Sequence, residues 1–111
     1  MDIEYEATFP HIDKESIRHK LTAAGATLAR PEFLQKRTTF KLPSGHEVKG
    51  GWARVRDEGN KITMSVKVVD GTTITDQKES CLTINSFNEG VEFLRLLGCQ
   101  EKAYQETKRE L

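Results

Sequence analysis

The chain has 111 residues, of which 36% are hydrophobic and 31% are charged, so it suits one folded domain with a modest core and excludes intrinsic disorder. Its 17 basic residues balance its 17 acidic residues, which argues against DNA, RNA or an anionic membrane as a partner and requires any anion site to be local. No apolar stretch is long enough to span a bilayer or to form a signal peptide, so we expect a cytoplasmic protein without membrane contact.

The first part of the chain predicts a strand followed by a helix. Apolar and polar residues alternate strictly over residues 3–9, which is typical of a strand with one buried face, and Pro10 ends the run. Asp13 is a candidate N-cap for a helix over residues 14–24, because apolar residues then recur at helical spacing until Gly25.

The rest of the chain predicts a meander of strands, a second helix and a last strand. Turn residues separate β-rich runs over residues 33–42, 52–57, 61–69 and 75–84, and one of these turns, Asp70-Gly71, precedes the last run. Ser86 and Glu89 match a capping box that opens a helix, which Gly98 ends. Residues 103–111 predict the final strand.

This order of elements predicts one α+β domain over residues 1–111, built on an antiparallel sheet. Both helices are expected to pack on one face of the sheet, because its apolar residues need a cover. Cys81 and Cys99 are too few for a disulfide scaffold and are expected to be buried reduced thiols.

The polar residues of the predicted strands are sorted by charge. Glu4 and Glu6 are two residues apart, so both carboxylates point the same way, as oxygen ligands of a hard divalent cation do. Arg54 and Arg56 are also two residues apart, and their planar guanidinium groups can each donate two hydrogen bonds to phosphate oxygens. Further charged residues extend this set, namely Lys67, Glu79 and Arg109. The competing interpretation is a solvated sheet face without a ligand.

These same residues resemble the motifs of the CYTH, or triphosphate tunnel, family, which includes class IV adenylate cyclases, thiamine triphosphatases and inorganic triphosphatases. The segment Ile3-Glu4-Tyr5-Glu6-Ala7-Thr8 is similar to the opening E-x-E-x-K signature of that family. Ala53-Arg54-Val55-Arg56 resembles its R-x-R strand, and residues 63–67 resemble the strand that ends in a substrate-contacting lysine. The order of the motifs extends the resemblance over essentially the whole chain.

The resemblance implies a barrel-like tunnel with a polar interior that binds a triphosphate: a nucleoside triphosphate, thiamine triphosphate or inorganic polyphosphate. It implies Mg2+ or Mn2+ as the cofactor and hydrolysis or nucleotide cyclisation as the reaction. The roles that it implies are catalysis for Glu4, Glu6 and Lys67, metal binding for Glu4, Glu6 and Glu79, and phosphate binding for Arg54, Arg56, Lys67 and Arg109.

Two departures from the family pattern keep a second hypothesis open. Thr8 stands at the position of the signature lysine, and Thr107 stands where a second basic residue is often found. The chain also resembles only the N-terminal part of the family fold, without its C-terminal strands. These departures favour a non-catalytic module that binds nucleotide or phosphate, or a fragment whose exposed last strand pairs two copies into a homodimer.

Overall fold

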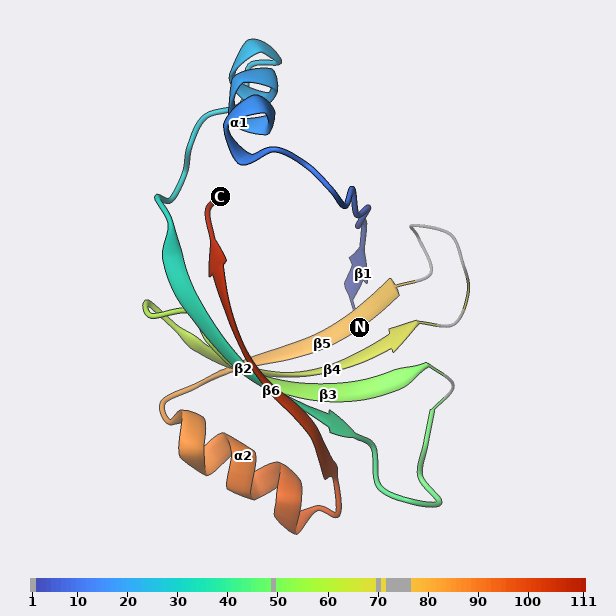
Figure 1. The fold of residues 1–111 in the computed structure, drawn as a ribbon. Coiled ribbons are helices and arrows are strands. Elements are labelled where there is room, and N and C mark those ends of the chain that lie inside the picture. The colour runs from blue at the N-terminus through green and yellow to red at the C-terminus, as the bar shows by residue number, and fades with distance from the viewer. Residues whose placement is uncertain (1, 49, 70, 72–76) are drawn as a thin grey trace.

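The structure is a computed structural model that describes residues 2–48, 50–69, 71 and 77–111 (Figure 1). Its strands are β1 (Asp2–Glu4), β2 (Phe33–Lys41), β3 (Gly51–Asp57), β4 (Ile62–Val69), β5 (Gln77–Ile84) and β6 (Gln100–Arg109). Its helices are α1 (Lys14–Ala23) and α2 (Phe87–Leu96). Within these described ranges, neither helix has the length and apolar character needed to cross a membrane.

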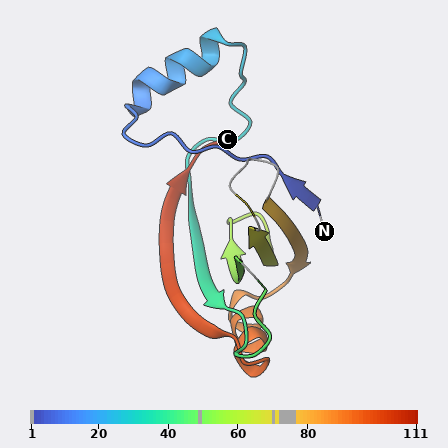
Figure 2. The same cartoon turned by 90° about the vertical axis from the view of Figure 1, so that its right-hand side faces the viewer.

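The strands form one six-stranded antiparallel sheet in the order β1-β5-β4-β3-β2-β6. The sheet curves, with β6 and β2 on one side and β5 and β1 on the other, but it does not close (Figure 2). We call its concave side the inner face and its convex side the outer face. The expected α+β class with an antiparallel sheet is therefore confirmed.

The apolar core lies on the outer face, between the sheet and α2, which is drawn below the sheet in Figure 1. Phe40, Ala53 and Val55 are fully buried in β2 and β3, and α2 adds the buried side chains of Val91 and Leu94. The helix begins as predicted, because the Ser86 side chain accepts a hydrogen bond of 3.1 Å from the backbone N–H of Glu89. This core packs α2 against β3 and β4, behind the inner face.

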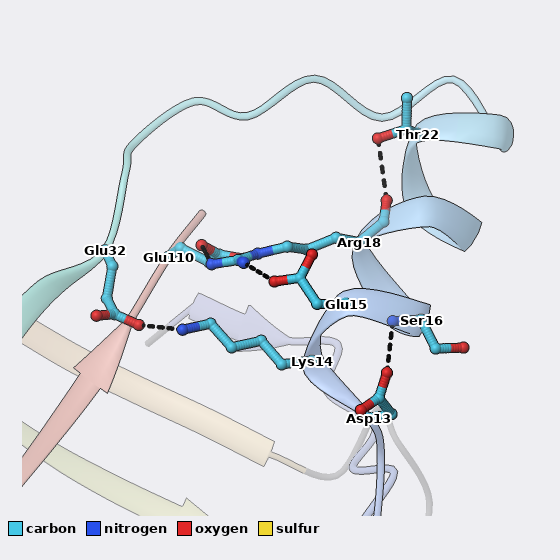
Figure 3. A network of polar contacts seen from close by, with 8 residues as sticks. All are labelled: Asp13, Lys14, Glu15, Ser16, Arg18, Thr22, Glu32 and Glu110. Carbon is cyan, nitrogen blue, oxygen red and sulfur yellow. Dashed lines mark hydrogen bonds and ion pairs between the residues drawn. The ribbon is translucent and has the colours of Figure 1, made fainter.

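Helix α1 lies at the opposite end of the molecule from α2, so among the described elements only α2 covers the outer face and the expectation that both helices share one face is wrong (Figure 1). Charged side chains hold α1 in its place (Figure 3). None of its residues is buried. Arg18 donates hydrogen bonds of 2.7 and 2.8 Å to the two carboxylate oxygens of Glu110, and Lys14 pairs with Glu32 at 2.7 Å. The predicted cap is confirmed, since the Asp13 side chain accepts a hydrogen bond from the N–H of Ser16.

Three further sequence-based expectations need correction. The first strand ends at Glu4 rather than at residue 9, since residues 5–10 form no regular element. The last strand begins at Gln100 rather than at residue 103, because β2 continues to Lys41 and pairs with it there. Cys99 is buried as expected, but Cys81 is exposed on β5. The expected start of the fifth strand at residue 75, like the turn residue Asp70, lies outside the described residues.

Candidate functional site

The inner face collects the polar side chains of four neighbouring strands, β2 to β5, into cross-strand rows. Residues opposite each other in antiparallel strands share a face. Arg37 lies opposite Arg56, and Arg54 lies opposite both Thr39 and Ser65. In the next row, Lys67 lies opposite Trp52 and Glu79. The predicted residues Arg54, Arg56, Lys67 and Glu79 therefore share one face.

Two of these charged side chains are buried although they line a polar face. Only 3% of the surface of Arg54 and 8% of that of Lys67 is exposed. Arg54 donates a hydrogen bond of 3.3 Å from Nη2 to Oε1 of Glu79. Burial of charged groups costs free energy unless opposite charges accompany them, so Glu79 is a structural counter-charge of this face.

A cluster of three arginines, Arg37, Arg56 and Arg109, forms where β2, β3 and β6 meet. Burial lowers the pKa of Arg37, and the neighbouring charges of Arg109 and Arg56 lower that pKa further. Nε of Arg37 donates a hydrogen bond of 2.7 Å to the amide oxygen of Gln105. Among the described residues, no carboxylate forms an ion pair with Arg37 or Arg109, whereas Arg56 lies 3.7 Å from Glu58. The cluster is therefore rich in positive charge and suited to an anion.

Two of the three carboxylates predicted to hold a metal, Glu6 and Glu79, meet at Lys67. Nζ of Lys67 lies 3.9 Å from Oε2 of Glu79 and 4.0 Å from Oε2 of Glu6. The backbone of Glu4 pairs with that of Gln77, but its side chain lies outside the described part of the structure. Within the described ranges, no group of three His, Cys, Asp or Glu side chains is arranged to hold a metal ion.

The chemistry of these carboxylates nevertheless fits Mg2+ or Mn2+. Magnesium bound with phosphates uses one or two carboxylates and completes its oxygen shell with the phosphates themselves. Glu6 and Glu79 supply two carboxylates that approach one point from different elements. They are the residues that would hold the cation in the described part of the chain.

A cavity of about 450 Å³ opens on the inner face beside the arginine cluster. Basic residues in its lining are Arg37, Lys41 and Lys102. Trp52 stands between two of the cations of the site, with its ring centre 5.7 Å from Cζ of Arg54 and 5.7 Å from Nζ of Lys67. The polar and aromatic side chains of the inner face that line the cavity are Arg37, Thr39, Lys41, Trp52, Lys102 and Gln105.

Uncharged polar groups are buried on the same face without a hydrogen-bond partner among the described residues. They are both amide atoms of Gln35 and the hydroxyls of Thr63 and Ser65. The exposed fractions of these three residues are 1%, 3% and 1%. Buried polar groups in native proteins are normally paired, so these atoms favour a bound polar ligand or ordered water on the inner face.

The sequence-based reasoning missed Arg37 and Gln35 as site residues. The signal was the alternation of Gln35, Arg37 and Thr39, which places three polar side chains on one face of a strand whose other face holds Phe40. The predicted Arg109 joins the site through β6, because Phe33 pairs with it in register and its charge acts on Arg37.

Neither a protein-family model nor a curated protein sequence matches the chain. Two solved structures share its fold. One is the PH1012 protein from Pyrococcus horikoshii OT3, with a TM-score of 0.73 and 21% identity over 89% of this chain and 58% of that one. The other is a conserved hypothetical protein, Pfu-838710-001, from Pyrococcus furiosus, with a TM-score of 0.72 and 22% identity over 97% of this chain and 61% of that one. This chain therefore spans about three-fifths of the length of both proteins.

Proposed function

We propose that the inner face binds a triphosphate-containing ligand together with Mg2+ or Mn2+, for phosphoanhydride hydrolysis or nucleotide cyclisation. The observation that carries this proposal is the cluster of Arg37, Arg56 and Arg109 on the inner face. Arg37 lies directly opposite Arg56 in this cluster, and its pKa is lowered by burial and by the charges of Arg109 and Arg56. Gathering like charges on a partly buried surface costs free energy, and a bound polyanion offsets that cost. The resemblance of the strand motifs to the CYTH family points to the same ligand class.

The spacing of the basic residues suits several phosphates in a row. Arg56, Arg54 and the Trp52–Lys67 pair stand in successive rows along β3. Four residues of strand span about 13 Å, so positive charge follows the inner face over roughly that length. Arginine can hold phosphate oxygens with two parallel hydrogen bonds, whereas Lys67 supplies a point charge.

The chemistry expected here rests on positioning and on neutralisation of charge. When bound, the cation would polarise the phosphate oxygens and lower the pKa of a water molecule. Arg54 and Lys67 would bind oxygens of the group that is transferred, and Glu79 keeps both of these cations in place. Burial of Arg54 and Lys67 strengthens their electrostatic effect on charge that develops in the transition state.

A non-catalytic triphosphate-binding module is the second candidate function. Thr107 lies on the inner face opposite Gln35, and Thr8 is exposed beyond the end of β1, so neither position supplies the cation expected from the resemblance. A binding module has little use for carboxylates beside its anion, however, so Glu6 and Glu79 favour the enzyme. Release of phosphate or pyrophosphate from ATP, thiamine triphosphate and tripolyphosphate with Mg2+ separates the two functions.

The experiment that tests binding is a thermal melt with tripolyphosphate, with and without Mg2+. A ligand bound by the native state alone raises the melting temperature. The test variant is Arg37→Gln/Arg109→Gln. Its matched control is Lys36→Gln/Lys108→Gln, which removes two exposed positive charges from the outer face of the same two strands.

We expect the ligand to raise the melting temperature of the wild type and of the control variant but not that of the test variant. Both variants lose the same net charge, so unspecific attraction of the anion falls equally in both. Equal shifts in the two variants, or no shift of the wild type at millimolar ligand, would contradict the proposal.

A further inference from the structure

Lys67 lies near the carboxylates of two residues, one in a strand and one in an irregular segment. Glu79 lies directly opposite Lys67 in the β4–β5 pairing. Glu6 lies in the irregular segment between β1 and α1, and its Oε2 lies 4.0 Å from Nζ of Lys67. This distance is compatible with an ion pair but is too long for a direct hydrogen bond.

The two carboxylates differ in how firmly the fold holds them. The side chains of Lys67 and Glu79 are 10% and 11% exposed, whereas that of Glu6 is 53% exposed. Release of Glu6 from Lys67 therefore exposes no core residue and breaks no regular element. Glu79 also accepts a hydrogen bond from Arg54, so its release would leave a buried guanidinium without that partner.

We infer that Glu6 determines which form of the ligand the site accepts: its carboxylate masks Lys67, so the site selects the divalent-cation complex of a triphosphate over the free anion. This inference rests on the proposed function of the inner face. Without a cation, a phosphate oxygen that approaches Lys67 meets the negative charges of Glu6 and Glu79 within 4.0 Å of the same ammonium group. With the cation present, Glu6 can leave Lys67 and contribute an oxygen ligand to the complex.

Removal of the Glu6 charge should strengthen binding of the triphosphate without a cation and reduce the gain in affinity that Mg2+ gives. In Glu6→Gln, the free anion no longer competes with a carboxylate for Lys67, so metal-free binding becomes stronger. The same variant loses a ligand for the cation, so the gain in affinity on addition of Mg2+ becomes smaller. A residue that only stabilised the fold would change both affinities in the same direction.

The test is calorimetric titration of the full chain with tripolyphosphate, in EDTA and in excess Mg2+. The wild type, Glu6→Gln and the control Glu92→Gln are compared. Glu92 is exposed on α2, away from the inner face, and its substitution removes the same charge. Circular dichroism melts verify that each variant folds.

We expect Glu6→Gln to bind metal-free tripolyphosphate about threefold more tightly than Glu92→Gln does, the scale of a partly exposed ion pair. The ratio of affinities with and without Mg2+ should fall by at least the same factor. An unchanged ratio, or weaker binding under both conditions, would overturn the role of Glu6 while leaving the triphosphate site intact. No binding by the wild type under either condition would overturn the proposed function as well.

Discussion

Arg37 shows how a charged residue can be costly to the fold and useful to the site. Its guanidinium is partly buried, lies near Arg56 and Arg109, and donates to Gln105. The amide of Gln105 orients the guanidinium but does not neutralise it. Repulsion within such a cluster lowers the stability of the ligand-free protein, and a bound anion offsets this loss. Binding sites often reduce the stability of a fold in this way.

Substitution of Arg37 should therefore separate stability from binding. Arg37→Gln relieves the repulsion from Arg56 and Arg109, so the ligand-free protein should keep its free energy of unfolding or gain about 0.5 kcal/mol. Its affinity for tripolyphosphate should fall about tenfold, because a charge-assisted contact is lost. Urea unfolding and calorimetric titration measure the two quantities. Destabilisation together with unchanged affinity would show that Arg37 is structural.

Substitution of Gln35 is expected to stabilise the ligand-free protein. The residue is 1% exposed, and its amide has no hydrogen-bond partner among the described residues. Gln35→Leu keeps a similar volume and removes the cost of burying that amide. We expect the free energy of unfolding of the ligand-free protein to rise by about 1 kcal/mol. A loss of stability in urea unfolding would show instead that the amide is satisfied by bound water in the native protein.

At the scale of elements, caps and turns could be predicted from the sequence, but the partners of each element could not. Asp13 and Ser86 cap their helices as expected, because capping depends on residues within one turn. Residues 3–9 alternate as a strand does, yet β1 ends at Glu4, and alternation alone does not say which neighbour a strand has. That neighbour is set by the topology of the whole sheet.

Because the sequence does not reveal which strands pair, only part of the candidate site could be predicted. The basic residues of β3 and β4 could be predicted, because a period of two assigns each of them to a face of its own strand. The influence of Arg109 on Arg37 could not, because it depends on the pairing of β2 with β6, which residues 42–99 separate along the chain.

The attachment of α1 makes a prediction about pH. Hydrogen bonds from Arg18 lower the pKa of Glu110 below its ordinary value of 4.5. A carboxyl group whose pKa is lowered by folding stabilises the folded state at every pH above its ordinary pKa. This contribution disappears as the pH falls through the lower pKa of the folded state. The contact between α1 and the end of β6 should therefore persist at pH 5 and weaken only in stronger acid.

A titration of the Glu110 carboxyl by NMR measures this directly. We expect its pKa to lie below 4.5 in the wild type and to return toward 4.5 in Arg18→Gln. The control is Lys20→Gln, which removes a positive charge from the same helix outside the Arg18–Glu110 pair. An identical pKa in the wild type and in Arg18→Gln would show that the pair does not form in solution.

At the scale of the whole molecule, the open edge of the sheet is the dominant feature. β6, which is ten residues long, pairs with β2 on one side and is an edge strand of the sheet. Such an edge offers backbone donors and acceptors to a second strand, so we expect self-association of this chain. Sedimentation velocity over a range of concentrations measures it, and a constant monomer mass up to high concentration would contradict this expectation.

The curvature of the sheet and its two differently covered faces connect the fold to the proposed function. The outer face holds the apolar core beneath α2, while the inner face holds buried charge between β6 and β5 (Figure 2). Arg54 and Lys67 are buried and each lies beside Glu79, so fewer side-chain rotamers should be lost when an anion binds than at an exposed site.

The most direct test of this account is NMR observation of the arginine side chains during titration with tripolyphosphate and Mg2+. The Nε–Hε signals of Arg37, Arg54 and Arg56 should shift together and saturate with one affinity, while that of Arg95, on α2 at the outer face, stays in place. Shifts confined to Arg95 and other outer-face residues, or no shifts at millimolar ligand, would contradict a triphosphate site on the inner face.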